Sequence, residues 1–353
     1  MSKEPRLKVA IIGAGPGGLG AAIEFAKLPF VDWELYEKRS LISEIGGGFT
    51  IQPQTWRLLE HNGAADNISS EDFFRPAQGQ IEQRRNGRTG ELLIEKCHEH
   101  DCIRQFCFPS HTLHYNGQFV YRTIVSKTEV ANIEGIPWAP VFWKNVSGLY
   151  VFTCPLGGDD FEVTARIRRQ NEDSEPVSWG RPFDLHALLP EYHDFCRPVR
   201  QILGLAAEGD TQEFALFFGN HLGHVISGNN IAMIGDASHA LLGNLGSGAG
   251  FALEDAYTLA RAIKWAWLGG KTLKAGLELF DSVRPPHYQR LHNLVSRFAE
   301  IKAELRAKSL TLDDEIAERV KRISKASESW MYDYEIDKVV DEALEAADMG
   351  MGQ

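Results

Sequence analysis

The sequence predicts an α/β protein with two domains and a helical C-terminus, and three observations lead to this fold class. Residues 7–12 form a short apolar run that passes directly into a glycine-rich turn and a helical pattern. A second apolar run, at residues 230–234, also enters a glycine-rich turn, at residues 235–250. Between these units, residues 115–170 alternate and are rich in Val, Phe, Tyr and Trp, which is typical of a sheet.

The first elements predict a complete strand–turn–helix–strand unit. Residues 7–12 read LKVAII and predict a buried parallel strand, residues 19–28 a helix, and residues 33–37 a second strand. Three glycines lie between the first strand and the helix with Gly-x-Gly-x-x-Gly spacing: Gly13, Gly15 and Gly18. They allow a tight turn, close approach of the backbone to a pyrophosphate, and close packing of helix on strand. The free N–H groups and dipole of the helix N-terminus favour that anion, so the unit predicts a Rossmann-like dinucleotide site.

An acid follows at the position that this site needs. Glu37 ends the second strand, 24 residues after Gly13, where a carboxylate binds ribose hydroxyls. The alternative for Glu37 is an exposed charge at a strand end. Arg39, two residues later, is also expected to contact the cofactor.

The remaining elements follow from the same patterns in chain order. A glycine cluster at residues 46–48 precedes a helix-like segment at 55–60, and residues 79–90 predict a hairpin. Proline and charge predict a loop at residues 170–182, followed by helical pattern from 184 to 201 that Pro190 and Pro198 must break or bound. Helices are expected from residue 253 to the end.

Charge and composition exclude several classes of protein. The 353 residues include 37 basic and 48 acidic side chains, a net charge of −11, which disfavours nucleic acid or an anionic membrane surface as main partner. No apolar run approaches the length of about 18 residues that a membrane span needs. The first apolar run enters a glycine turn instead of a cleavage site, so we expect a cytoplasmic protein. Five cysteines are too few for a disulfide scaffold.

The second glycine-rich turn indicates which dinucleotide binds. The run from Ile231 ends in Gly235-Asp236, further glycines follow, and Leu253-Glu-Asp-Ala begins the next helix. In these residues the chain resembles the FAD-dependent aromatic hydroxylases, the p-hydroxybenzoate hydroxylase-like flavoproteins, and most of all their fungal salicylate hydroxylase-like members. The resemblance implies that Asp236 holds the flavin ribityl chain. It also implies that the backbone of Gly246, Gly248 and Ala249 lies beside the pyrimidine end of the flavin, where a helix N-terminus stabilises negative charge.

The alternative for this turn is an ordinary strand–turn–helix with a capping aspartate. His239 is expected to be a packed, hydrogen-bonded structural residue, not a catalytic base. Residues 44–53, with Gly47 and Gly48, are similar to the family's second flavin loop. Arg122 stands in the expected sheet where related enzymes carry an arginine facing the substrate, so it is our candidate catalytic residue. Its alternative is a surface strand charge. Cys154 stands where the family often has tyrosine, which argues against a tyrosine acid there.

One stretch departs from the family. The family carries an Asp-Gly motif and an arginine-bearing helix before the substrate sheet, and this chain has no Asp-Gly dipeptide. By resemblance, the junction between about residues 95 and 115 is short by roughly sixty to eighty residues, about half a domain. The junction contains cysteine and histidine, from Cys97 to His114, with a spacing that fits structural zinc sites only loosely. We predict a junction loop and no metal.

These observations predict a Rossmann-like FAD domain, assembled from residues 1–75 and 226–290, with a sheet-rich substrate domain at 76–225 and C-terminal helices at 291–353. The implied reaction is hydroxylation of an aromatic or polyketide-like small molecule, with FAD as cofactor, NAD(P)H as reductant and O₂ as the source of oxygen. Two alternatives remain. One is another flavin oxidoreductase of the same fold, and the other is a truncated flavin-fold protein without activity.

Overall fold

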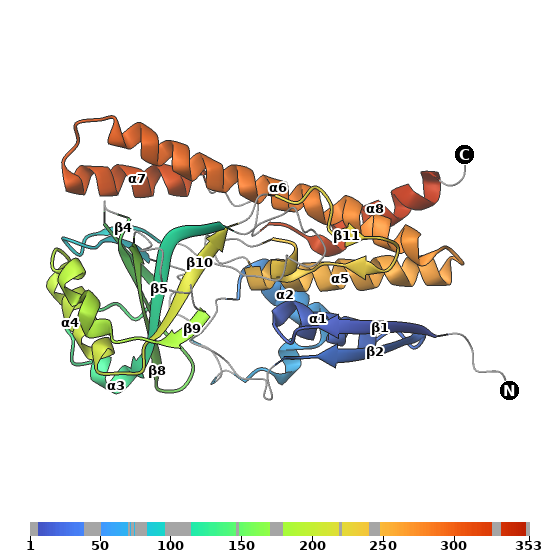
Figure 1. Ribbon diagram of the computed structural model, residues 1–353, viewed down its shortest axis with the longest axis horizontal. Coiled ribbons are helices and arrows are strands. Elements are labelled where there is room, and N and C mark those ends of the chain that lie inside the picture. Colours follow the sequence, from blue (N-terminus) through green and yellow to red (C-terminus); the bar gives the residue numbers. More distant parts are fainter. Residues whose placement is uncertain are drawn as a thin grey trace.

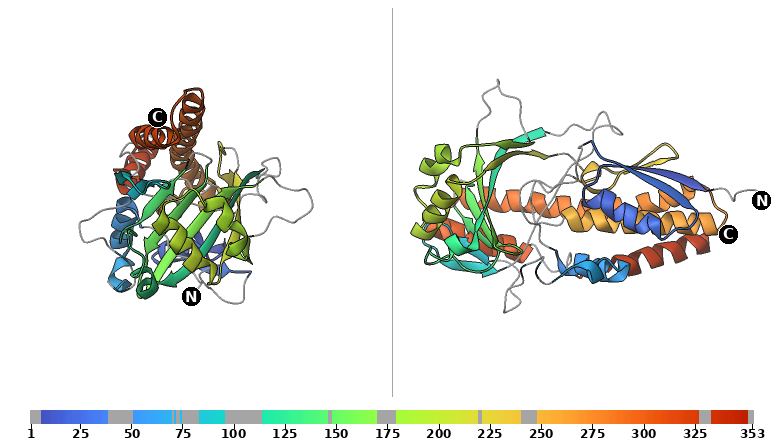
Figure 2. Two further views of the ribbon diagram at one scale, coloured as in Figure 1. Left: turned by 90° about the vertical axis from the view of Figure 1, so that its left-hand side faces the viewer. Right: turned by 90° about the horizontal axis from the view of Figure 1, so that it is seen from below.

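The computed structural model confirms a mixed α/β fold with a large sheet and C-terminal helices (Figure 1). It describes residues 6–38, 51–69, 71, 74, 83–95, 114–145, 148–169, 179–218, 221–239, 248–326 and 333–350. Two parts lie side by side along the long axis, and helix α6 (Leu273–Arg306) extends over both of them (Figures 1 and 2).

The N-terminal unit has the predicted order. Strand β1 (Leu7–Ile12) pairs in parallel with β2 (Val31–Tyr36), and helix α1 (Pro16–Ala26) connects them. The helix begins three residues before its prediction because Pro16, at the first helical position, already has the fixed φ that a helix needs. Helix α1 packs against α5 (Gly248–Leu268), which forms the second layer of this domain.

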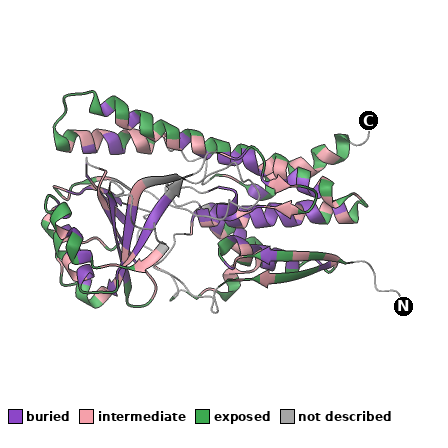
Figure 3. Cartoon of the chain, in the orientation of Figure 1, coloured by how far each residue is buried: buried purple, intermediate pink, exposed green. Residues whose placement is uncertain are grey.

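The prediction that β1 is buried is wrong. Ile11 is buried, but Ile12 is 68% exposed and Tyr36 is 48% exposed. Figure 3 shows that much of the strand pair nearest the N-terminus is coloured as exposed or intermediate. Among the described residues β1 pairs with β2 alone, so this sheet has two strands. Helix α1 covers one face, and the alternating residues on the other face meet solvent. A parallel strand is buried on both faces only when both are covered.

The larger sheet contains eight strands among the described residues, in the order β4-β3-β6-β7-β8-β5-β10-β9. Strands β3 and β6 pair in parallel and all other neighbours are antiparallel. The strands are β3 (Gln83–Asn86), β4 (Leu92–Glu95), β5 (His114–Ser126), β6 (Val141–Lys144), β7 (Tyr150–Pro155), β8 (Asp160–Arg168), β9 (Trp179–Pro182) and β10 (Gln212–Phe218). The predicted hairpin is present but lies a few residues further along the chain.

One face of this sheet is covered by helices and forms the larger core. Val199, Ile202 and Leu203 of α4 (Arg197–Ala207) pack against buried residues of β5 and β8 such as Tyr121 and Val163. The short helix α3 (Lys127–Val130) and the 3₁₀ helix η2 (Leu185–Tyr192) border the same core. The prolines act as predicted: Pro190 lies in η2 and Pro198 in the first turn of α4, so no continuous helix forms.

Helices also cover the remaining parts of the molecule. Helix α7 (Leu312–Ala326) packs back on α6 and contacts β3 and β4, while α8 (Ile336–Gly350) contacts α5 and α6. Helix α2 (Pro53–Asn62) packs on α5 and leads to the short η1 (Ala65–Asn67). The predicted boundary between residues 290 and 291 falls inside α6. None of the described helices is long and apolar enough to cross a membrane.

The strand predicted at residues 230–234 is shorter than expected. Only Ile231–Ala232 form a strand (β12), and it pairs antiparallel with β11 (Ile226–Ser227). The backbone N–H of Met233 donates to the carbonyl of Val225 and extends this hairpin by one bond. The chain then enters the single 3₁₀ turn η3 (Gly235–Ala237). The strand expected over residues 230–234 is therefore present only as the short second strand of a local hairpin.

Candidate functional site

The three glycines of the first turn have the three different geometries that a dinucleotide turn requires. Gly13 has a φ of 96°, which favours glycine. A Cβ on Gly18 would lie 1.8 Å from the carbonyl oxygen of Gly13, so only glycine allows the helix to pack this closely. A Cβ on Gly15 would meet no atom within 4 Å. The space in front of Gly15, at the N-terminus of α1, fits a bound pyrophosphate.

Glu37 is oriented by the same turn. Its Oε2 accepts a hydrogen bond of 2.9 Å from the backbone N–H of Ala14, which places the carboxylate beside the glycine turn. This geometry agrees with a role next to the ribose better than with a free strand-end charge. Arg39, Gly47, Gly48 and Gly246, the other expected cofactor contacts, lie outside the described residues.

Asp236 is a buried carboxylate without a partner. It is only 6% exposed, and neither of its side-chain oxygens accepts a hydrogen bond. Burial of a carboxylate without hydrogen bonds is costly, so such a group indicates a ligand that supplies the missing donors. The hydroxyl groups of a ribityl chain are donors of the required kind. The environment of Asp236 therefore suits a bound FAD, whose ribityl hydroxyls would supply the missing hydrogen-bond donors.

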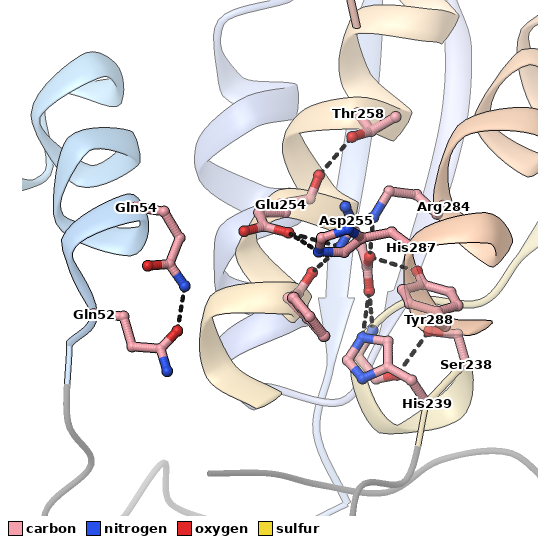
Figure 4. Close-up of polar contacts among 12 residues, drawn as sticks. Gln52, Gln54, Ser238, His239, Glu254, Asp255, Thr258, Arg284, His287 and Tyr288 are labelled. Atoms are coloured by element: carbon pink, nitrogen blue, oxygen red, sulfur yellow. Dashed lines mark hydrogen bonds and ion pairs between the residues drawn. The ribbon is translucent and has the colours of Figure 1, made fainter. Parts of the chain in front are cut away.

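The start of α5 lies against the start of α2. Gly248 is the first residue of α5 and is buried, and Ala249 follows with partial exposure. A Cβ on Gly250 would lie 2.4 Å from Thr55 Oγ1, so the two helices approach closely at this glycine. Figure 4 shows Gln52 and Gln54, from the start of α2, on the side of α5 where Glu254 points. The side-chain oxygens Thr55 Oγ1 and Gln54 Oε1 are buried without partners.

A buried network holds the Asp236 turn in place, and Asp255 is its centre (Figure 4). One oxygen of Asp255 accepts from Arg284 Nε at 2.7 Å and from the Tyr288 hydroxyl at 2.5 Å. The other lies 2.8 Å from the backbone N of Gly235 and 2.9 Å from His239 Nε2. Burial alone would raise the pKa of Asp255, but Arg284 and these hydrogen bonds lower it to about 2.

The network explains His239 and adds residues that the sequence analysis missed. His239 is fully buried and bonded to Asp255, as expected for a structural residue. Arg284 and Tyr288 come from α6, 29 and 33 residues beyond Asp255, and had no predicted role. The Glu-Asp pair after the second glycine turn was the available signal, because two adjacent acids on a buried helix need a buried cation.

Stability should fall as the pH rises through the range set by Glu254. Burial raises the pKa of Glu254 from 4.5 to about 7, although Arg284 Nη2 lies 2.9 Å from its carboxylate. Between these values the folded protein holds a proton that the unfolded chain has released. The free energy of unfolding should therefore decrease by about 3 kcal/mol as the pH rises from about 4.5 to above 7. Glu254→Gln should remove this decrease. Urea unfolding of both proteins from about pH 5 to about pH 8 measures it, and parallel profiles would contradict the assignment.

Arg122 lies on the face of the large sheet that points away from α4, which we call the second face. Its neighbours Tyr121 and Thr123 point to the α4 side, so alternation places Arg122 opposite them. Arg122 Nε lies 3.0 Å from Glu162 Oε1, and the guanidinium stacks on Phe214 at 5.8 Å. The side chain of Glu162 is 2% exposed, so it neutralises the arginine inside the protein. Arg122 is therefore half of a neutral pair and not a free surface charge.

Other candidate features lie away from these residues. A cavity of about 650 Å³ adjoins the C-terminal ends of α1 and α2, opposite to the ends that carry the glycine turns. Burial raises the pKa of the Cys154 thiol, so it is a poor proton donor at neutral pH. The described residues contain no group of His, Cys, Asp and Glu that could hold a metal ion. Cys97, Cys102 and Cys107 lie outside the described part of the chain.

Known proteins that the chain resembles place its fold in one class. A salicylate hydroxylase of Pseudomonas putida is 32% identical over 428 residues, which cover 96% of this chain and 94% of that protein. A 2-heptyl-3-hydroxy-4(1H)-quinolone synthase of Pseudomonas aeruginosa is 24% identical over 321 residues, 72% of this chain and 80% of that protein. No protein-family model matches the chain. The protein is a flavoprotein monooxygenase.

Within this class the chain belongs to the family of FAD-dependent aromatic hydroxylases that includes salicylate hydroxylase. Solved structures agree in fold. CtdE in complex with FAD and a substrate has a TM-score of 0.77 at 17% identity and covers 99% of this chain and all of its own. A salicylate hydroxylase substrate complex has a TM-score of 0.73 at 19% identity and covers 97% of this chain and 98% of its own. FAD is the cofactor.

The alignment with the family is longer than the chain. It spans 428 positions but covers 96% of the 353 residues, about 339, so about 89 positions of the alignment face gaps in this chain. These gaps are more numerous than the sixty to eighty residues predicted to be missing, and whether they form one segment stays a prediction. The position of the gap stays a prediction, because the junction at residues 96–113 lies outside the described residues.

Proposed function

We propose that this FAD-dependent monooxygenase hydroxylates a small aromatic or polyketide-like molecule on the second face of the large sheet. The observation that carries the proposal is the arrangement of the two parts. The end of β1 and the starts of α1 and α5 lie on the side of their domain that is turned towards that sheet (Figure 1). Related proteins carry names with aromatic substrates, among them salicylate hydroxylase and hispidin-3-hydroxylase.

Different residues of the chain would bind different parts of FAD. The N-terminus of α1 with Gly13, Gly15 and Gly18 would hold the pyrophosphate, and Glu37 would bind the ribose. Asp236 would hold the ribityl chain, and Gly248 and Ala249 at the start of α5 would face the flavin ring. Arg39, Gly47, Gly48 and Gly246 remain proposed contacts from the resemblance. Bound FAD supplies electron transfer from NAD(P)H and activation of O₂, while the protein binds, orients and excludes water.

Arg122 is proposed to orient the substrate. Because Glu162 neutralises it, the pair offers hydrogen bonds to a ring substituent without a strong preference for anions. We also propose that the protein lies in the cytoplasm. A further proposal is that the domains divide at residues 75, 225 and 290.

Asp236→Ala tests the cofactor assignment. The variant should bind FAD about ten- to a hundredfold more weakly, because about 1–3 kcal/mol of hydrogen bonding to a buried ligand is lost. Without FAD it should be as stable as the parent or more so, since Asp236 accepts no hydrogen bond from the residues that the structure describes. Fluorescence titration with FAD and thermal melts of the FAD-free proteins measure both effects. Unchanged FAD affinity would refute the assignment, and a large loss of stability would show that Asp236 is structural.

The two alternatives give different results in simple assays. An inactive flavin-fold protein would show no flavin spectrum after reconstitution and no NAD(P)H oxidation. Another flavin oxidoreductase would oxidise NAD(P)H without forming a hydroxylated product from any phenol. A monooxygenase should oxidise NAD(P)H faster when its substrate is present and should release the hydroxylated ring.

A further inference from the structure

Positive charge gathers where the α6–α7 hairpin covers one end of the large sheet. The group, called the cationic cluster below, consists of Arg166, Arg168, Lys302, Arg306 and Arg319. Two of its members lie against described residues between β6 and β7. Arg319 Nη2 donates to the Asn145 carbonyl at 2.6 Å. Lys302 Nζ lies 3.6 Å from the position of a Cβ on Gly148.

Arg166 forms the floor of the cluster. It is 6% exposed and lies on the second face, two residues along β8 from Thr164, which pairs with Arg122. Its Nη1 donates to the Tyr150 hydroxyl at 3.1 Å and its Nη2 to the Gln118 side chain, and both partners are uncharged. Its Nε has no partner. Among the residues that the structure describes, no carboxylate pairs with Arg166, whereas Arg122 pairs with Glu162. A buried guanidinium without such a partner is costly.

The positive charges at the rim of the cluster, on Arg168, Lys302 and Arg306, are also not neutralised by described acidic residues. Arg168, Lys302 and Arg306 form no ion pair in the described structure, and Arg168 and Arg306 are exposed. Lys302 and Arg306 are one helical turn apart on α6, where like charges repel. Burial and the four surrounding arginines lower the pKa of Lys302. Within the cluster, Arg319 forms an ion pair of 3.3 Å with Glu315. This excess of positive charge contrasts with the chain's net charge of −11.

We propose that the cationic cluster is an oxyanion-binding site, which takes the carboxylate or phosphate group of a ligand lying over the second face. Arginine presents a planar set of donors that matches these anions, and lysine adds charge. The exposed rim gives access, and the buried floor offers an N–H that no protein group uses. A bound anion would neutralise charges that now repel each other.

Two sources of the anion are compatible with this chemistry. One is a carboxylate on the aromatic substrate, and the other is a phosphate of the nicotinamide dinucleotide. The choice between these sources rests on the proposed function, whereas the oxyanion site itself does not. Binding to the FAD-free protein therefore tests the site separately from turnover.

The test compares anion binding by the parent protein and by a double variant, Arg168→Gln with Lys302→Gln. Neither side chain has a hydrogen bond or ion pair with a described residue, so the fold should persist, which thermal melts check. Arg200→Gln, at an exposed arginine of α4 behind the opposite face, is the matched control. The probes are 2-hydroxybenzoate, its uncharged amide and inorganic pyrophosphate, titrated by calorimetry at low and high salt.

At least one anion should bind the parent and the control equally, and at least tenfold more weakly to the double variant. Added salt should weaken that binding, and the amide should not distinguish the proteins. Preference for 2-hydroxybenzoate identifies the substrate as the source, and preference for pyrophosphate identifies the dinucleotide. Failure of both anions to bind, or equal affinity for parent and double variant, would overturn the site. Failure of FAD to bind in a separate titration would instead refute the proposed function.

Discussion

Asp255→Asn should lower the free energy of unfolding by about 3–5 kcal/mol, the cost of breaking a buried ion pair from one side. The four groups around Asp255 all present hydrogens to its two oxygens, and asparagine keeps only one oxygen. Its amide nitrogen would face donors. Arg284, which is fully buried, would keep only Glu254 as an acidic neighbour.

The substitution should also weaken FAD binding, because Asp255 accepts a hydrogen bond from the backbone of Gly235, next to Asp236. Chemical unfolding and FAD titration of the variant measure the two effects. Asp348→Asn is the control: this exposed acid accepts from Trp265 on the surface and should change stability little. A variant at Asp255 as stable as the control would contradict a structural role for the network.

Restoring a family segment between Glu95 and Tyr115 should strengthen FAD binding and speed reduction by NAD(P)H. By resemblance, that segment supplies an arginine to the flavin phosphates and an Asp-Gly motif that serves flavin and nicotinamide. Each missing charge-assisted hydrogen bond is worth about 1.5–3 kcal/mol, so two or three losses would make FAD binding weak in the 353-residue chain.

Anaerobic stopped-flow reduction, followed by flavin absorbance, measures this effect in the chain with and without the segment. An unrelated linker of equal length controls for the change in chain length. Slow reduction of the chain as it stands and faster reduction after restoration are expected. Rapid, saturable bleaching by NADPH in the unaltered chain would mean that the shortened junction is functional.

Local patterns predicted the nucleotide turn well. The glycine spacing defines a turn whose geometry depends on neighbouring residues alone, and Gly13, Gly15 and Gly18 have the three predicted environments. The strand predicted at residues 230–234 is present only at Ile231–Ala232, for the opposite reason. An apolar run predicts that a strand will be buried, but its partner depends on the rest of the chain, and here residues 226–227 are the partner.

Ion pairs between residues that are far apart in the chain could not be predicted from the sequence. Nothing near Asp255 in the chain indicates that Arg284 neutralises it, because α5 and α6 must first pack together. The same holds on the large sheet, where Arg122 and Arg166 look alike in sequence. Only the register of β5, β7 and β8 shows that one faces Glu162 and the other faces Tyr150 and Gln118.

The origin of the oxygen in the product is the most direct test of the central claim, that this chain is an FAD-dependent monooxygenase. The FAD-loaded protein is supplied with NAD(P)H, isotopically labelled O₂ and a panel of phenols that includes 2-hydroxybenzoate. The masses of the products are then measured by mass spectrometry. The expected product is a hydroxylated ring that carries one labelled oxygen atom and forms only when both FAD and NAD(P)H are present. Consumption of NAD(P)H with all the label recovered as hydrogen peroxide, or a product whose new oxygen comes from water, would contradict it.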